Sequence, residues 1–324
     1  MLLPEYIPVV DLKRGNFVDQ RFFGIATLYG FSDGFPVEIL KIGNENNYPF
    51  FLRSLLKPIQ ASIMADYNTA GHYGFSDAEI AVMQASHAGE KIHTDLVLSI
   101  LKWTGLSEDF LKCPAISPLC PNVLKTDELP RKVHNNCSGK HAMFLAVSKQ
   151  LGFSLENYTD VNHSVQKLVL DKICELAEIE HSKVPQTYDG CTLPVWALPF
   201  CNIAKAFFKL YTNKRYSFLK EAYKKNPYII GGKDSSGYRQ DTHIMMLNPS
   251  LISKTGAGGF LSIYNDEKNE FLLVKMAQDN NTARFLFTLK ILEKLNWIKE
   301  NPLDYSFYDE VGRVVGEYFC NISV

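Results

Sequence analysis

The order of its local patterns constrains this chain most: strand-like segments stand at both ends and helix-like segments fill the middle. Segments rich in β-branched and aromatic residues occupy 7–10, 22–28 and 37–42, and again 251–253, 260–264 and 271–274. Between them, apolar residues recur every three or four positions, the helical spacing, over 77–86, 95–103, 140–151, 165–179 and 195–211. A last helix over 282–295 precedes a short apolar tail at 314–319.

This order predicts an α/β fold with one mainly antiparallel sheet. The two ends of the chain would supply its strands, from about 5–50 and 250–276, and a central helical block at about 54–230 would pack against it. The succession is not the strand–helix–strand alternation of a parallel sheet. The glycine cluster at 256–259 lies between two late strands and predicts a tight turn. We therefore expect a single catalytic domain over residues 1–324.

Composition excludes several classes of protein. The formal net charge is −1 and no basic stripe is present, so a nucleic-acid footprint is not expected. No glycine-rich phosphate loop joins a strand to a helix. No uncharged apolar run of about 18 residues is found, and no signal peptide is expected at the N-terminus. The seven scattered cysteines favour reduced thiols, so we expect a cytoplasmic protein without a membrane partner.

The sharpest chemical feature is Arg53-Ser54-Leu55-Leu56-Lys57-Pro58. A serine hydroxyl needs a base to become a nucleophile. A spacing of three residues puts Ser54 and Lys57 on one face of a helical turn, and burial can lower a lysine pKa until its amine acts as that base. Pro58 is tolerated only near a helix start, so the pair would stand in an opening turn with free backbone N–H groups. The tetrapeptide alone is common, and it is a weak signal.

Two further elements belong to the serine–lysine hydrolases of the β-lactamase type. A literal Lys254-Thr255-Gly256 ends a late strand, in the expected order, but no Ser-Asp-Asn is present. A second serine, Ser86, ends the helix predicted at 77–86, and a second lysine, Lys275, ends the last strand of the hairpin. Spacing alone does not pair these two residues.

A third feature is the segment 134–141, with Cys137, Lys140 and His141, followed later by Cys191. Two thiols could bind a soft or borderline metal such as zinc. By ordinary ligand preference His141 would be the third ligand, because a lysine coordinates only when neutral. The alternative is that both cysteines are small buried residues.

Together these segments resemble one family, the bacterial L-asparaginase II family, also called class 3 L-asparaginases. The stretches Arg-Ser-x-x-Lys-Pro-x-Gln-Ala and Asn-Asn-Cys-Ser-Gly-Lys-His carry most of the likeness. The matching segments follow family order over nearly the whole chain, at 10–15, 23–30, 53–61, 85–90, 135–146, 163–168, 188–199 and 254–259. The resemblance implies a fold similar to that of serine β-lactamases and glutaminases.

The resemblance also implies roles for individual residues. Ser54 and Lys57 become a first catalytic pair, and Ser86 with Lys275 a second, for which Lys254 is the rival lysine. The family's zinc ligands match Cys137, Lys140 and Cys191. Contacts to the amino-acid substrate match Arg53, His141, Asp189 and the turn at Gly256. Two departures stand out: Gly258 replaces an acidic residue frequent in the family, and the segment 233–241 departs from the pattern and receives no role.

These expectations favour an enzyme that hydrolyses L-asparagine to L-aspartate and ammonia through an acyl-enzyme formed by tandem Ser-Lys pairs. The serine that forms the covalent bond and the preference between asparagine and glutamine stay open. A related hydrolase acting on glutamine, a β-lactam or a small peptide is the second hypothesis. A catalytically silent metal-binding or interaction protein is the third. The family also implies a homodimer.

Overall fold

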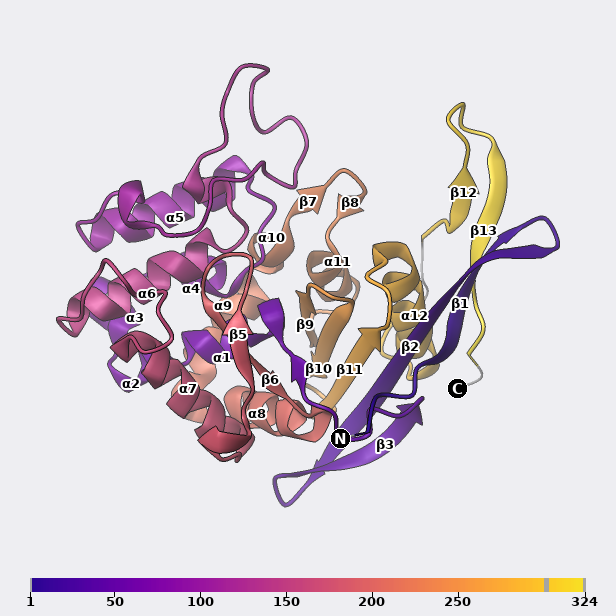
Figure 1. Ribbon diagram of the computed structural model, residues 1–324, viewed down its shortest axis with the longest axis horizontal. Helices are drawn as coiled ribbons and strands as arrows, with labels where there is room; N and C mark the ends of the chain where they lie inside the picture. Colours follow the sequence, from indigo (N-terminus) through magenta and orange to yellow (C-terminus); the bar gives the residue numbers. More distant parts are fainter. Residues whose placement is uncertain (1, 300–302, 323–324) are drawn as a thin grey trace.

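The computed structural model describes residues 2–299 and 303–322, and a long antiparallel sheet divides them into two packed layers (Figure 1). The sheet runs in the order β12-β13-β1-β2-β11-β10-β9, with β3 paired to β2 outside that path. Its strands are β1 (Ile7–Arg14), β2 (Phe17–Ser32), β3 (Phe35–Ile42), β9 (Leu251–Gly256), β10 (Phe260–Asn265), β11 (Glu270–Met276), β12 (Ser306–Tyr308) and β13 (Val314–Cys320). The prediction of an antiparallel sheet built from both ends of the chain is confirmed.

The long strand β2 joins the two ends of the chain. It pairs antiparallel with β1 and β3 from the N-terminal side and with β11 from the C-terminal side. In the last pairing Ala26 lies opposite Val274 and Leu28 opposite Leu272, all four of them buried. Because β9 and β10 are buried at every position, both faces of this part of the sheet are covered.

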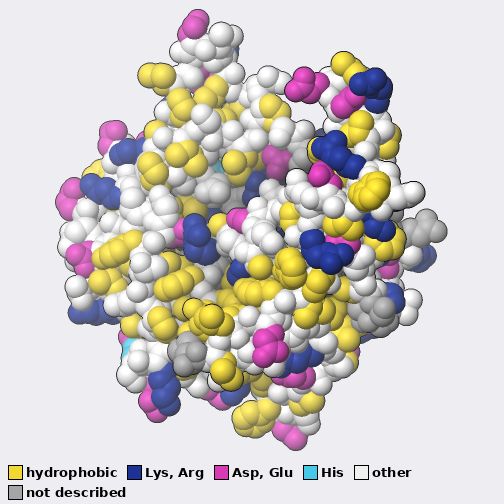
Figure 2. Space-filling view, turned by 45° about the vertical axis from the view of Figure 1, so that its right-hand side comes forward, with side chains coloured by type: hydrophobic (Ala, Val, Ile, Leu, Met, Phe, Trp, Pro, Cys, Tyr) yellow, Lys and Arg dark blue, Asp and Glu magenta, His cyan; other side chains and the backbone are white. Residues whose placement is uncertain are grey.

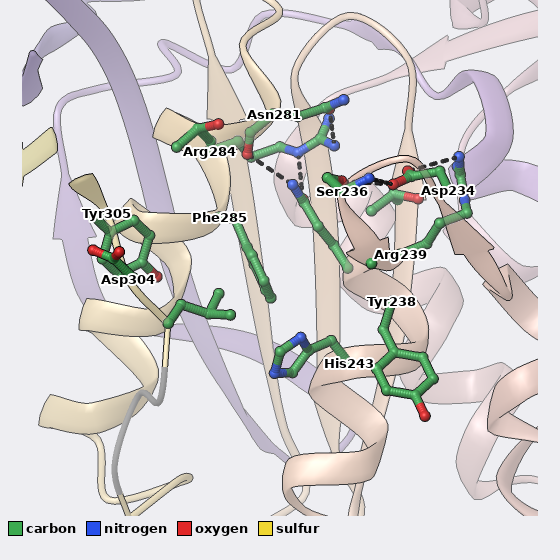
Figure 3. A pocket seen from close by; sticks show the side chains of 15 residues that line it. Asp234, Ser236, Tyr238, Arg239, His243, Asn281, Arg284, Phe285, Asp304 and Tyr305 are labelled. Atoms are coloured by element: carbon green, nitrogen blue, oxygen red, sulfur yellow. Dashed lines mark hydrogen bonds and ion pairs between the residues drawn. The ribbon is translucent and has the colours of Figure 1, made fainter. Parts of the chain in front are cut away.

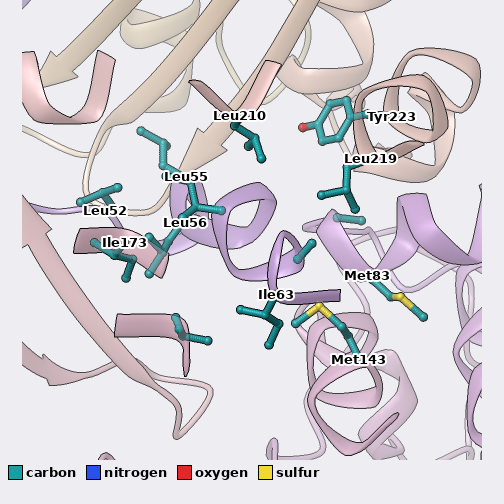
Figure 4. Close-up of a cluster of buried hydrophobic side chains, with 14 of the residues drawn as sticks. Leu52, Leu55, Leu56, Ile63, Met83, Met143, Ile173, Leu210, Leu219 and Tyr223 are labelled. Atoms are coloured by element: carbon teal, nitrogen blue, oxygen red, sulfur yellow. The ribbon is translucent and has the colours of Figure 1, made fainter. Parts of the chain in front are cut away.

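The helical block covers one face of the sheet, as predicted. Its shared core contains residues from the sheet and from the helices, and Figure 4 shows Leu55, Leu56, Met83, Met143 and Leu210 converging there. The block contains α1 (Lys57–Ala61), α2 (Ile63–Asp66), α3 (Thr69–Tyr73), α4 (Asp77–Gln84), α5 (Lys91–Trp103), α6 (Ser138–Gln150), α7 (Ser164–Ala177), α8 (Phe200–Thr212), α9 (Ser217–Lys225) and α10 (Pro227–Gly231).

Two helices complete the other side. α12 (Asn281–Lys294) packs with β1, β11 and β13 around a second apolar cluster, and α11 (Gln240–Leu247) packs against the edge strand β9. Short strands lie outside the main sheet: β4 (Phe50–Phe51), β5 (Gln186–Tyr188) and β6 (Pro194–Leu198) form one small sheet, and β7 (Lys233–Asp234) with β8 (Gly237–Tyr238) another. The 3₁₀ turns are η1 (Arg53–Leu56), η2 (Glu108–Phe110), η3 (Lys132–His134), η4 (His181–Lys183) and η5 (Lys214–Tyr216).

Two details differ from the sequence reading, and a third agrees with it. The helix predicted from residue 195 begins at Phe200, because Pro194–Leu198 forms a fully buried strand and Pro199 stands at the N-cap. The apolar tail predicted at 314–319 is strand β13, which extends the sheet. The turn at 256–259 is confirmed, with Gly258 and Gly259 at φ 77° and 82°, where glycine is favoured.

The surface carries both signs of charge. Figure 2 shows acidic and basic side chains interspersed over one face, with a hollow near its middle. Among the described residues, every helix is too short or too polar to cross a membrane.

Candidate active site

The Ser54–Lys57 turn stands where the sheet meets the helical block. Ser54 lies in η1 and Lys57 begins α1, with Pro58 in the first positions of that helix, as the sequence predicts. Strand β9 ends directly against this turn, since a Cβ on Gly256 would come within 2.7 Å of Leu55 Cδ1. Glycine at 256 therefore lets the end of the sheet approach the start of the first helix.

The Lys57 side chain is fully buried and its amine has three partners. Nζ lies 2.6 Å from the Ala85 carbonyl oxygen, 2.9 Å from that of Asn136 and 3.0 Å from Ser86 Oγ. Carbonyl oxygens only accept hydrogen bonds, so a neutral amine would give both N–H groups to them. Its lone pair would then face the Ser86 hydroxyl, which is the arrangement of a general base.

The electrostatics of the pocket favour the neutral form of this amine. Burial is the largest cause that lowers the pKa of Lys57, to about 8, and the charges of Lys140 and Lys254 lower it further. Cys137 and Cys191 act in the opposite direction. A substantial fraction of Lys57 is therefore neutral near pH 8.

The two serines differ in access. Ser86 follows α4, is 3% exposed, and donates its backbone N–H to Ile230 O. Ser54 is partly exposed, and among the described residues its hydroxyl has no hydrogen-bond partner. The fold thus brings Lys57 to Ser86, 29 residues away, while Ser54 stands one turn before Lys57 with a free hydroxyl.

Lys275 lies elsewhere. On β11 its amine donates to Met276 O at 2.5 Å and stands over the rings of Tyr6 and Phe260 at 5.7 and 5.6 Å. The structure does not bring Lys275 to Ser86, because β10 separates β11 from the edge strand β9 that faces the helical block. Burial lowers its pKa to about 8, but within the described part of the chain the neighbours of this amine are the Tyr6 and Phe260 rings and not a serine hydroxyl.

The rival lysine, Lys254, lies closer to the Ser54–Lys57 turn. Its amine is almost fully buried and pairs with Asp241 Oδ2 at 3.0 Å, and the Thr255 hydroxyl donates to the same oxygen at 2.9 Å. Burial lowers the pKa of Lys254 while Asp241 opposes that shift. Because its charge in turn lowers the Lys57 pKa, Lys254 belongs to the electrostatic surroundings of the Lys57 amine.

The three expected metal ligands lie together. Lys140 Nζ is 3.4 Å from Cys191 Sγ, and the Cys137 and Cys191 thiols share a hydrogen bond. That bond is the largest cause that lowers the pKa of Cys191, to about 5, and it raises that of Cys137 to about 12. The nearby sulfurs outweigh burial and raise the pKa of Lys140. Cys137 is therefore the donor to a Cys191 thiolate beside a lysine ammonium.

His141 does not join this cluster. It is fully buried, its Nδ1 lies 2.7 Å from the Tyr158 hydroxyl, and burial lowers its pKa to about 3. Among the described residues no group of three or more His, Cys, Asp and Glu side chains could hold a metal. A third ligand beside the cysteines would therefore be Lys140.

The expected substrate contacts Arg53 and Asp189 form an ion pair. Arg53 Nε donates to Asp189 Oδ1 at 2.6 Å, and the arginine side chain stays 37% exposed. Burial opposes ionisation of Asp189, but Arg53 and Lys140 keep its pKa below the usual value. Arg53 itself has the positive φ of 51°, which turns the chain sharply into η1.

Sequence reasoning missed three parts of this site. The carbonyls of Ala85 and Asn136 that orient Lys57 are backbone groups without a residue-type signal. Asp241, the partner of Lys254, lies in the segment that received no role. A buried carboxylate near a buried lysine is recognisable only when the fold places them together.

Comparison with known proteins gives the class of this chain: residues 10–318 match the model of a family of amidohydrolases. That family is L-asparaginase II; the chain belongs to it, and membership implies an asparaginase. A search of curated proteins finds no match.

Two solved structures resemble the chain in outline. A β-lactamase from Mycobacterium bovis has a TM-score of 0.45 at 13% identity, covering 84% of this chain and 94% of its own. A D-alanine carboxypeptidase, AmpC, from Burkholderia cenocepacia has a TM-score of 0.39 at 11% identity, with 84% and 93% covered. Likenesses this remote do not bear on the chemistry of the site.

Proposed function

We propose that this asparaginase hydrolyses L-asparagine by serine nucleophilic catalysis with Lys57 as the base. The observation that carries the proposal is the position of the buried Lys57 amine, which lies one turn after Ser54 in the chain. Two backbone carbonyls accept its hydrogen bonds, and its third neighbour is Ser86 Oγ. This arrangement activates a hydroxyl without a histidine.

Ser54 is the nucleophile in this proposal, because its hydroxyl is free and partly exposed while that of Ser86 is buried on Lys57. Ser54 Oγ attacks the side-chain amide carbon, and its proton passes to neutral Lys57. Ser86 then carries that proton to the amide nitrogen, so ammonia leaves and a β-aspartyl ester remains on Ser54. Water attacks the ester carbonyl and gives one proton to Lys57. The bond between that carbon and Ser54 Oγ then breaks, Lys57 returns the proton to Ser54 Oγ, and L-aspartate is released.

The substrate's α-groups have complementary partners nearby. The exposed part of the Arg53 guanidinium suits the α-carboxylate, and the Asp189 carboxylate suits the α-ammonium. Their mutual ion pair holds both in place before substrate arrives.

Cys137, Lys140 and Cys191 fit a zinc ion, since two sulfurs and an amine converge in a buried cluster where one thiol is already acidic. The ion would supply a Lewis acid that orients a substrate oxygen. Binding would displace the Lys140 proton.

We expect the purified protein to contain about one zinc per chain. Changing Cys191→Ser should abolish retention of zinc through gel filtration, measured by elemental analysis, because a thiolate ligand is lost. Cys174→Ser is the matched control, a buried cysteine on α7 outside the cluster. Equal zinc content in the two variants would contradict this assignment.

Ammonia release tests the function directly. Purified protein should release ammonia from L-asparagine and not hydrolyse nitrocefin, and L-glutamine run in parallel sets the side-chain preference. Turnover of glutamine alone, or of nitrocefin alone, would reject the proposal in favour of the related hydrolase.

The rate should depend on pH through Lys57. The base works only when neutral, and burial lowers its pKa to about 8, so kcat/KM should rise with pH and level off above about 8. A profile from pH 6 to 10 with asparagine below KM measures it. A rate that is flat or falls across pH 7–9 would exclude a lysine base.

We also propose the homodimer implied by the family, which light scattering after gel filtration would test.

A further inference from the structure

A cavity of about 410 Å³ lies beside the end of β9, between α11, the start of α12, the β7–β8 hairpin and residues 303–305. Ser54, Lys57 and Ser86 are not among the described residues that line it. Six of the fifteen lining residues come from the segment 233–241, for which the sequence offered no role. Figure 3 shows Arg239 and Asp234 on one side, Arg284 and Asn281 at one end, and Phe285, His243 and Tyr238 along the wall.

The Arg239 guanidinium is the feature that calls for a ligand. Its side chain is only 19% exposed, and its buried Nε has no hydrogen-bond partner within 2–299 and 303–322, the residues that the structure describes. The nearest carboxylate, Asp234, is 3.8 Å away and already accepts hydrogen bonds from the backbone N–H and the hydroxyl of Ser236. A guanidinium presents several donors in a planar fork, and leaving them unpaired inside a protein costs free energy. A carboxylate in the cavity would satisfy them.

The surroundings of Arg239 favour an anion at this end. Arg284 lines the same cavity. Its buried guanidinium donates to Gln240, Asn281 and the Gly256 carbonyl, and Asp279 Oδ1 lies 3.6 Å from it. Arg239 also stands at the N-cap of α11, and Asn281 begins α12, where backbone N–H groups lack helical partners. Two guanidiniums and two helix starts therefore present hydrogen-bond donors at this end, beside the carboxylates of Asp234 and Asp279.

The rest of the wall is apolar and aromatic. The His243 ring contacts Phe285 edge-on, with centroids 5.4 Å apart, and Tyr238 at 6.4 Å. Burial lowers the pKa of His243, so the ring is neutral at pH 7 and presents an aromatic surface. Leu303 also lines the cavity. Such a wall suits an aromatic ring or a branched alkyl group.

We propose that this cavity is a second binding pocket, which takes a small carboxylate carrying an aromatic body, with the carboxylate on Arg239 and the ring against Tyr238, His243 and Phe285. Free aromatic amino acids and aryl-substituted short-chain acids share this chemistry. The pocket adjoins the catalytic side through Thr255, which lines it and donates to the Asp241 that holds Lys254. The inference is independent of the proposed reaction.

Calorimetric titration of the full chain with L-phenylalanine, 3-phenylpropionate and inorganic phosphate tests it. At least one aryl carboxylate should bind with about one site per chain and more tightly than phosphate. Arg239→Gln should weaken that binding about tenfold or more, the loss of a charge-assisted hydrogen bond. Arg14→Gln, an exposed arginine paired with Asp19, is the matched control and should not change it.

Tyr238→Ala separates the two halves of the pocket. Tyr238 is 39% exposed, so its removal should leave the fold intact. The variant should bind the aryl carboxylates more weakly, and its affinity for phosphate should not change. Titration with L-aspartate present should give an unchanged affinity. No binding by either aryl carboxylate, binding indifferent to Arg239, tighter binding of phosphate, or competition with L-aspartate would each overturn the proposal. Because binding is read by heat, an inactive protein would not obscure the answer.

Discussion

Replacing Lys57 with methionine is expected to reduce ammonia release from L-asparagine by about 10²- to 10⁴-fold, the range that a general base contributes. Methionine keeps the length and the apolar stem of the side chain but removes the amine that lies on Ser86 Oγ and the two carbonyls. Since the nucleophile keeps its place and loses its base, kcat should fall more than KM changes. Initial rates over a range of asparagine concentrations, by a coupled ammonia assay, measure both constants.

Ser54→Ala should be at least as damaging, because it removes the nucleophile. Ser62→Ala is the control, since Ser62 lies eight residues further on, is fully buried where Ser54 is partly exposed, and its hydroxyl donates to Ile59 O within its own turn. Thermal unfolding of each variant separates lost catalysis from lost structure. A folded Lys57→Met protein with near-normal kcat would remove the amine from the mechanism and with it the assignment of this site.

The fold was predictable where the local pattern and the tertiary packing agree. Alternating or continuous apolar runs at the two ends of the chain became β1, β2, β10 and β11, because the helical block and α12 cover both faces of these strands. The segment 194–198 misled because its spacing also suits a helix. The segment forms a strand that is buried at every position, and Pro199 then stands at the N-cap of the helix that follows.

The site was predictable where the groups lie within one turn and not where distant segments meet. Ser54 and Lys57 are three residues apart, so their placement at a helix start followed from the sequence. The contact between Lys57 and Ser86 joins positions 29 residues apart. The choice between Lys254 and Lys275 depends on the order of the strands in the sheet. Lys254 lies on the edge strand β9, which faces the helical block, whereas Lys275 lies on β11, two strands further into the sheet.

The Lys254–Asp241 pair gives the largest expected effect on stability. Both side chains are almost fully buried, and Asp241 Oδ1 has no partner within the described part of the chain. Changing Lys254→Met leaves a buried carboxylate without its cation, so the free energy of unfolding should fall by about 3–5 kcal/mol. Lys275→Met is the matched control, because its amine bonds a backbone carbonyl at 2.5 Å and loses no carboxylate partner. Urea unfolding compares the two.

The double variant Lys254→Met/Asp241→Asn distinguishes a lost ion pair from poor packing. If the penalty comes from the unpaired buried carboxylate, removing the charge from residue 241 should restore more than half of the lost free energy of unfolding. The Thr255 hydroxyl can still donate to the amide oxygen of the new side chain. Packing strain would instead persist in the double variant. Equal loss in Lys254→Met and Lys275→Met would show that the buried pair is not what ties the edge of the sheet to α11.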